Sequence, residues 1–162
     1  MSGTCVGLSG RQRQARQATG RSGLTLLELL FVLAIIAVLA LLAATVYARV
    51  VENSRVTQAI VEVGDLAVEI ERLRSTTFQY PDALPSPRLD PWGRPYVYTR
   101  LEGIKGKGKA RKDHALNPLN TDFDLFSTGK NGVFKPQVSQ KDSLDDIIRA
   151  RNGGYVGLAG EF

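Results

Sequence analysis

The hydrophobic pattern of the chain begins with one long stretch that carries no charge. Residues 29–48 read LLFVLAIIAVLALLAATVYA, which is 20 residues without Asp, Glu, Lys or Arg. At ~1.5 Å per residue, an α-helix of this length measures about 30 Å, the thickness of the hydrocarbon layer of a bilayer. Because apolar residues occur on every side of this helix, the segment predicts a membrane span. A signal peptide has a shorter apolar core of about 7–15 residues, and a buried helix of a soluble protein is rarely so long or so apolar.

The pattern becomes amphipathic after Arg49, while it keeps the spacing of a helix. Apolar residues recur at intervals of three and four, which places them on one face. They are Val56, Ala59, Ile60, Val63, Leu66, Ala67, Ile70 and Leu73. Helix propensity falls in the Ser-Thr-Thr that follows Arg74. We therefore expect one helix over residues 24–74, and its second half needs a partner that covers the apolar face.

The rest of the chain predicts a small sheet that supplies this cover. Residues 78–95 contain five prolines and predict an irregular loop. Alternating patterns predict strands over 95–101 and 121–127, residues 153–159 predict a last short strand, and residues 143–150 suggest a short helix. Trp92, Tyr96 and Tyr98 are expected to pack the sheet against the long helix. The predicted fold class is α+β, with a long N-terminal helix packed on a small antiparallel β-sheet.

The charge distribution orients the predicted span in the membrane. The net charge is +5, but residues 1–23 hold four arginines and no acid, and the remainder carries 17 Lys and Arg against 16 Asp and Glu. Basic residues before a span favour a cytoplasmic N-terminus. We therefore expect a single-pass inner-membrane protein whose C-terminal domain is periplasmic. The single cysteine, Cys5, precedes Gly23, so the rest of the chain has no disulfide framework and no thiolate metal site.

The residues around Gly23 carry a resemblance to a known family. A basic leader ends at Gly23, LTLLE follows, and the apolar run comes next. This arrangement resembles the class III signal of type IV pilins and type II secretion pseudopilins. The resemblance implies that a prepilin peptidase cuts between Gly23 and Leu24 and that the new N-terminus, Leu24, is methylated. The chain would then consist of a cleaved leader (1–23), a transmembrane and assembly helix (24–48) and a pilin-like globular domain (49–162).

Four further segments narrow the resemblance to the G-type major pseudopilin of type II secretion. They are YP at 80–81, DPWGRPYVY at 90–98, FDLFSTGKNG at 123–132 and SLDDI at 143–147. The resemblance implies the type IV pilin fold and a helical homopolymer that acts with minor pseudopilins and an inner-membrane assembly platform to drive secretion across the outer membrane. The chain departs from the family at Thr45, where proline is usual, and at Ala37, which replaces a glycine.

Glu28 is the only acid among residues 24–48, and no Lys or Arg lies within three residues of it. An ionised side chain in the membrane costs roughly 2.5–3.5 kcal/mol at a helix centre, so this position needs an explanation. Cleavage would turn the amine of Leu24 into a cation. The resemblance implies that Glu28 pairs with this amine on a neighbouring subunit during filament assembly. The alternative is an acid that is favoured by the partial positive charge of the helix N-terminus.

Three acids and one amide lie close together in the sequence after the predicted strand at 121–127. They are Asn131, Asp142, Asp145 and Asp146. Calcium takes about 6–8 oxygen ligands, and the resemblance implies calcium in this loop, with Asn131 where the family commonly has Asp. Asp145 and Asp146 are the preferred ligands. In the alternative, Ser143 caps a short helix with Asp146 in its first turn, and Lys135 and Lys141 argue against a tight cation site.

The remaining chemistry does not support an enzyme. The chain has one histidine, His114, and neither a P-loop nor an HExxH sequence. The basic run KGKGKARK at 105–112 has no interleaved aromatic residue, so we interpret it as a mobile, solvated loop and do not expect nucleic acid as a partner. The competing functions are a type IV pilus subunit for adhesion or DNA uptake, and a membrane-tethered binding module that does not polymerise.

Overall fold

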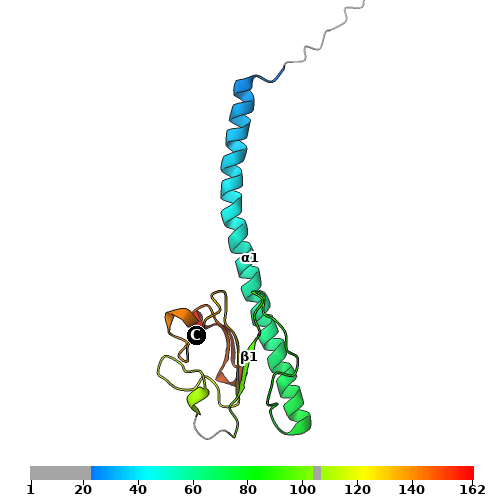
Figure 1. The fold of residues 1–162 in the computed structure, drawn as a ribbon, viewed down its shortest axis with the longest axis vertical. Coiled ribbons are helices and arrows are strands. Elements are labelled where there is room, and N and C mark those ends of the chain that lie inside the picture. The colour runs from blue at the N-terminus through cyan, green and yellow to red at the C-terminus, as the bar shows by residue number, and fades with distance from the viewer. Residues whose placement is uncertain (1–22, 104–106) are drawn as a thin grey trace, which may run out of the picture. The chain divides into compact units, whose positions relative to one another are not determined.

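The computed structural model describes residues 23–103 and 107–162. The chain divides into two compact units, with the boundary after Leu42. Helix α1 covers Leu26–Thr77, and the strands are β1 (Val97–Arg100), β2 (Phe123–Ser127), β3 (Ile147–Ala150) and β4 (Tyr155–Leu158), as Figure 1 shows. Short 3₁₀ helices lie at Lys107–Lys109, Lys141–Ser143, Arg151–Gly153 and Ala159–Glu161. The predicted leader lies outside the described residues except for Gly23.

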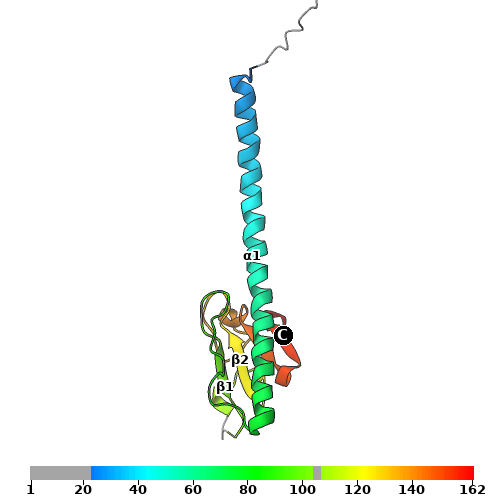
Figure 2. The same ribbon diagram turned by 90° about the vertical axis from the view of Figure 1, so that its right-hand side faces the viewer.

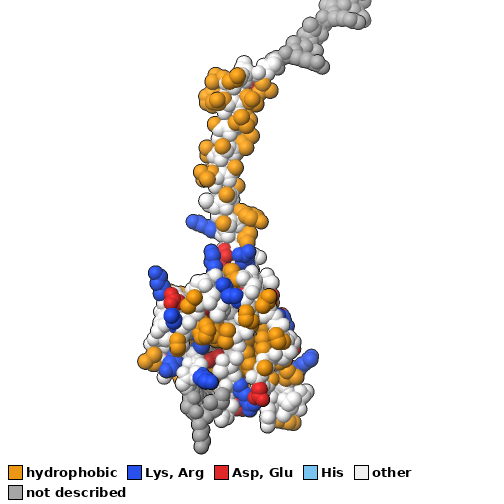
Figure 3. Space-filling view, in the orientation of Figure 1, with side chains coloured by type: hydrophobic (Ala, Val, Ile, Leu, Met, Phe, Trp, Pro, Cys, Tyr) orange, Lys and Arg blue, Asp and Glu red, His pale blue; other side chains and the backbone are white. Residues whose placement is uncertain are grey.

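The first unit is helical from Leu26, two residues later than we predicted. Thr25 explains this start, because its Oγ1 accepts a hydrogen bond from the backbone N–H of Glu28 at 3.2 Å. A threonine at this position satisfies one of the N–H groups that have no partner within the helix. Hydrophobic side chains cover the segment on the face that Figure 3 presents.

At its other end, α1 continues to Thr77, three residues beyond the predicted end. The hydroxyl of Ser75 donates to the carbonyl of Glu71 at 2.9 Å, and that of Thr77 donates to the carbonyl of Leu73 at 2.8 Å. These bonds give residues of low helix propensity a partner inside the last turn. The helix ends where Phe78 adopts a left-handed backbone, with φ of 58°.

The second unit contains one antiparallel sheet in the order β1-β2-β3-β4. The C-terminal part of α1 packs on one face of this sheet, next to β1 and β2 in Figure 2. The helix contributes the buried residues that its periodicity predicts, which are Ala59, Val63, Leu66, Ala67 and Ile70. Phe123, Leu125 and Ile147 of the sheet complete this core. The predicted α+β architecture is therefore confirmed.

The other face of the sheet is also covered. Phe126, Ile148 and Ala150 form a second core with residues of the surrounding loops, which are Leu119, Val138 and Ala159. The short helix predicted over 143–150 is wrong, because this region ends in strand β3. Ile147 and Ile148 are both fully buried on opposite faces of the sheet. A strand that is covered on both faces has no polar alternation, so its pattern is easily mistaken for that of a buried helix.

The aromatic residues join the sheet and its loops to the helix, as predicted. Trp92 donates its indole N–H to Glu52 at 3.1 Å. Tyr96 is buried and donates its hydroxyl to Glu62 at 2.5 Å. The prediction that Trp92 and Tyr96 pack the sheet against α1 is therefore confirmed. Tyr98 packs against the same core and donates its hydroxyl to the backbone carbonyl of Pro81 at 2.7 Å, so all three side chains have the hydrogen-bond partner that buried Trp and Tyr usually have.

Candidate functional site

The peptide bond between Gly23 and Leu24 precedes helix α1. A Cβ at Gly23 would meet no atom within 4 Å, and Leu24 is 70% exposed. A peptidase binds its substrate in a non-helical conformation, and exposed segments without helical hydrogen bonds are the usual sites of cleavage. The local structure is therefore compatible with cleavage, which stays a prediction, as does methylation of Leu24.

Glu28 lies in the first turn of α1 and is exposed. Its backbone N–H is bound by Thr25, but its carboxylate forms no ion pair with any residue of the part of the chain that is described. The position agrees with both interpretations, an acid at the helix N-terminus and an acid that awaits a partner. Pairing with the amine of a processed Leu24 stays a prediction, because this amine exists only after cleavage.

The helix that follows Glu28 presents apolar side chains on all sides. Leu30 is 59% exposed, Leu33 58% and Leu41 71%. By length and composition, α1 is able to cross a membrane. An apolar surface that surrounds a helix requires lipid or other apolar helices as its environment.

The structure brings together only part of the predicted calcium cluster. The side-chain amide of Asn131 donates to the carboxylate of Asp145 at 2.6 Å and to the backbone carbonyl of Asp142 at 2.8 Å. The backbone N–H of Asn131 donates to the second oxygen of Asp145 at 2.8 Å. These three residues form one hydrogen-bonded group. Both carboxylate oxygens of Asp145 accept a hydrogen bond from a nitrogen atom of Asn131.

Asp146 does not belong to this group. It is fully buried, and its Oδ2 lies 2.7 Å from a guanidinium nitrogen of Arg111. Burial raises the pKa of the Asp146 carboxyl to about 6, although the nearby Arg111 opposes this shift, and burial lowers the pKa of Arg111. Both pKa shifts indicate that the cost of removing the two charges from water outweighs their mutual attraction. The alternative helix cap at Ser143 is also wrong, because the strand β3 replaces that helix.

The four residues as they are arranged do not fit a calcium shell. Within the described ranges, no group of three His, Cys, Asp or Glu side chains is placed to hold a metal. The carboxylate of Asp142 lies 3.6 Å from the ammonium group of Lys135. Buried oxygens of Thr128 and Asp146 have no hydrogen-bond partner, but two oxygens fall short of the ~6–8 that calcium takes. Calcium binding stays a prediction that chelation can test.

The interpretation of residues 105–112 as a solvated loop is wrong for Arg111. This side chain is 4% exposed, and its guanidinium lies 4.3 Å from the ring centroid of Phe126. Lys109 is exposed, whereas Lys105 lies outside the described residues. A guanidinium that is buried against an aromatic ring and paired with a carboxylate serves the fold and is not available to bind phosphate.

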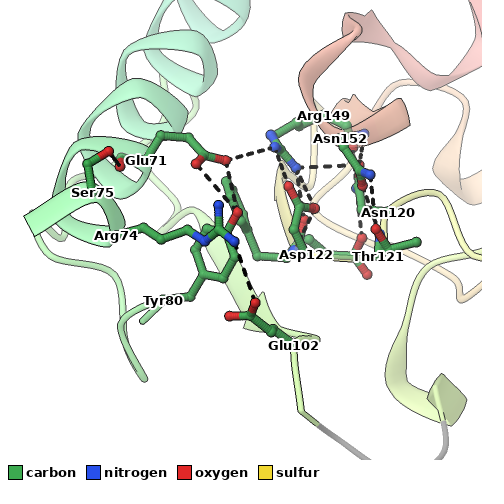
Figure 4. Close-up of polar contacts among 12 residues, drawn as sticks. Glu71, Arg74, Ser75, Tyr80, Glu102, Asn120, Thr121, Asp122, Arg149 and Asn152 are labelled. Atoms are coloured by element: carbon green, nitrogen blue, oxygen red, sulfur yellow. Dashed lines mark hydrogen bonds and ion pairs between the residues drawn. The ribbon is translucent and has the colours of Figure 1, made fainter. Parts of the chain in front are cut away.

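A second buried arginine, which the sequence analysis missed, links the sheet to the helix. Arg149 of β3 makes two parallel contacts to Asp122, at 2.6 and 3.0 Å, and its side chain is only 2% exposed. Its guanidinium lies 3.8 Å from the ring centroid of Phe123 and 3.5 Å from Glu71 of α1. Figure 4 shows Arg149 between Asp122 and Glu71, with Tyr80 donating to the same glutamate.

The sequence contained a signal for this network that is visible in retrospect. Arg149 interrupts an apolar run, IIRA, and Asp122 and Asp124 alternate with apolar residues of a strand. Asp124 is 2% exposed and accepts hydrogen bonds from Asn120 and from the backbone of Arg111. Charged residues in a buried strand are normally paired with an opposite charge. Arg149 in one short strand and the two aspartates near another would therefore have been candidates for an ion pair.

Comparison with known proteins supports one class of protein through a match at the N-terminal part of the chain. Residues 19–44 match the family model described as the prokaryotic N-terminal methylation motif, and this range contains Gly23, Leu24 and Glu28. The match indicates a type IV pilin-like protein, a class of typically structural subunits that form pili and pseudopili. It implies processing by a prepilin peptidase and association with a membrane. No curated protein and no solved structure matches the chain.

Proposed function

We propose that the chain is a structural subunit of a type II secretion pseudopilus. The observation that carries this proposal is the methylation motif over residues 19–44, which leads into a helix with exposed apolar side chains on all sides. Such a surface is stable in lipid before assembly and between neighbouring helices after it. The globular domain, which has its own core, would then coat the outside of the filament. In this function the subunits act by assembling into a filament, which requires no enzymatic chemistry.

Glu28 would direct the assembly of this filament. Once the peptidase has removed residues 1–23, the amine of Leu24 is a cation, and a carboxylate on an adjacent subunit is its natural partner in an apolar environment. Breaking such a desolvated pair costs about 3–5 kcal/mol, so an incoming subunit would be held in one register. Further partners would be minor pseudopilins and an inner-membrane assembly platform. The filament would grow into the periplasm.

The G-type assignment is supported by contacts between the segments that carry the resemblance. Asp90, from DPWG, accepts a hydrogen bond from the hydroxyl of Ser127, from FDLFSTGKNG, at 2.6 Å. Arg94 donates to the backbone carbonyl of Gly129. Gly132 adopts a left-handed backbone, with φ of 75°, which favours glycine, and it lies against the guanidinium of Arg94. Segments more than 30 residues apart in the chain are therefore in direct contact.

Mass spectrometry of the N-terminus of the native protein tests the proposal. The expected N-terminal peptide begins with methylated Leu24. An intact leader would refute the filament function and favour the membrane-tethered binding module. A methylated Leu24 in a protein whose deletion leaves secretion intact, but removes surface pili or DNA uptake, would favour the type IV pilus subunit, which shares the same motif.

A further inference from the structure

Two side chains bridge the connection between β2 and β3, residues 128–146: Ser143 bonds the backbone of Lys135, and Asn131 closes the wider part of the loop. Asn131 reaches across this loop, and both its side-chain amide and its backbone N–H donate to Asp145, while the amide also donates to the carbonyl of Asp142. Asn131 and Asp145 are 14 residues apart, so these bonds close the loop. Hydrogen bonds to an ionised carboxylate are stronger than those between neutral groups.

The orientation of the Asn131 amide is fixed by a fourth hydrogen bond. Its Oδ1 accepts from the backbone N–H of Val133 at 2.6 Å. With the oxygen facing Val133, the nitrogen must face Asp142 and Asp145. A reversed amide would bring two oxygens together at Asp145 and would place two nitrogens together at Val133. The nitrogen of Asn131 therefore lies between two oxygens, where a cation would otherwise be needed to hold them together.

The other acids of the loop also have cationic or nitrogen partners from the protein. Asp146 is paired with the buried Arg111 at 2.7 Å, and Asp142 lies 3.6 Å from Lys135. Gly129 leaves room for Asp145, because a Cβ there would overlap the backbone and carboxylate of Asp145. Every carboxylate in the loop thus has a partner that belongs to the chain itself.

We propose that the β2–β3 loop is closed by the amide of Asn131 without a metal ion, and that Asn131→Asp converts it into a loop that depends on calcium. The variant keeps the size of the side chain but replaces the donating nitrogen by an oxygen. This oxygen would face the carboxylate of Asp145 and the carbonyl of Asp142. Oxygen atoms with no donor or cation between them repel each other, and they are the ligands that calcium prefers, with water completing its shell. The inference holds for a pseudopilus and for a pilus subunit alike.

Thermal unfolding of the full chain in detergent micelles, with chelator and with added calcium chloride, tests this inference. The Tm of the unmodified protein is expected to be the same in both conditions. A cation present at a hundred times its Kd would instead raise Tm by on the order of 10 °C. Asn131→Asp is expected to lower Tm by about 5 °C in chelator, and calcium should restore at least half of this loss.

Two control variants separate the amide from the charge change. Asn53→Asp makes the same substitution on the exposed surface of α1 and should leave Tm and its response to calcium unchanged. Asn131→Ala removes the donors without adding a charge, and calcium should not restore its Tm. Hydrogen exchange of peptides from 128–146, measured by mass spectrometry, should rise roughly tenfold in both Asn131 variants, since these bonds close the loop locally.

Three results would overturn the proposal. A lower Tm of the unmodified protein in chelator would mean that a metal closes the loop. A variant Asn131→Asp that unfolds and exchanges like the unmodified protein would mean that the amide does not close it. If the Asn131→Asp variant is destabilised and calcium does not restore its Tm, the amide nitrogen of Asn131 does not lie where a cation would bind. If Asn131→Asp fails to fold, calorimetric titration of the unmodified protein with calcium decides, because measurable binding refutes the proposal.

Discussion

Replacing Arg149 with methionine tests how firmly the globular domain is attached to helix α1. Methionine keeps much of the length and the apolar stem of arginine but removes the guanidinium. This group contacts Asp122 through two nitrogens, lies over the ring of Phe123 and lies 3.5 Å from Glu71 of the helix. The variant therefore removes contacts to a loop, a strand and a helix with a single change.

The size of the effect follows from burial. Removing one partner of a buried ion pair costs about 3–5 kcal/mol, because the other charge stays behind without a partner. Asp122 is 12% exposed and keeps a hydrogen bond from the backbone of Phe123, which places its part at the lower end of this range. Glu71 is 42% exposed, so its contact adds little. We expect a loss of about 3 kcal/mol, or about 10 °C in Tm for a unit of this size.

Thermal and urea unfolding of the full chain in detergent, followed by circular dichroism, measure this loss. Arg72→Met is the matched control, because Arg72 is an exposed residue of α1, and its replacement should change the stability by less than about 0.5 kcal/mol. The double variant with Asp122→Asn should lose less than the sum of the two single losses by about 1–3 kcal/mol. A loss below about 1 kcal/mol for Arg149→Met, or additive losses, would refute the reasoning.

Three further predictions concern processing, assembly and pH. Gly23→Ala should leave a precursor of unreduced size on a gel, and normal processing would contradict the cleavage site. Glu28→Leu should insert into the membrane normally but reduce filament yield roughly tenfold or more, whereas an unchanged yield would contradict the pairing role. Burial, and at Tyr80 also the Glu71 carboxylate, raises the pKa of Tyr80 and Tyr98 from 10.0 to about 12. The folded state therefore holds these protons more tightly, and the stability they contribute should be complete below pH 10 and lost toward pH 12, as phenolate absorbance during alkaline unfolding would report.

The helix and its buried face were predictable because both depend on local periodicity. Of the eight apolar residues at intervals of three and four after Arg49, the structure buries five and leaves Val56, Ile60 and Leu73 partly buried at the edge of the same face. The ends of the helix were less predictable. Its start depends on the hydroxyl of Thr25, and its end depends on hydroxyl contacts of residues 75–77 and on the backbone of Phe78, which propensities do not describe.

Strand β3 and the predicted calcium cluster depended on information that is not local. Ile147 and Ile148 are buried on opposite faces because separate parts of the chain cover each face of the sheet. Asp146 is adjacent to Asp145 in sequence, but Asp145 lies in a turn against Asn131, whereas Asp146 pairs with Arg111, which lies 35 residues away. Counting acids within a short segment identified a charged cluster, but it did not identify the partner of each acid.

The acids on the polar side of α1 have a role that their spacing alone did not indicate. Four of them each hold a different part of the domain: Glu52 accepts from Trp92, Glu62 from Tyr96, Glu69 from Ser86, and Glu71 from Tyr80. These contacts flank the apolar face over about five turns of helix, because Glu71 follows Glu52 by 19 residues. A domain that is fixed at several heights along one helix has little freedom to rotate about it.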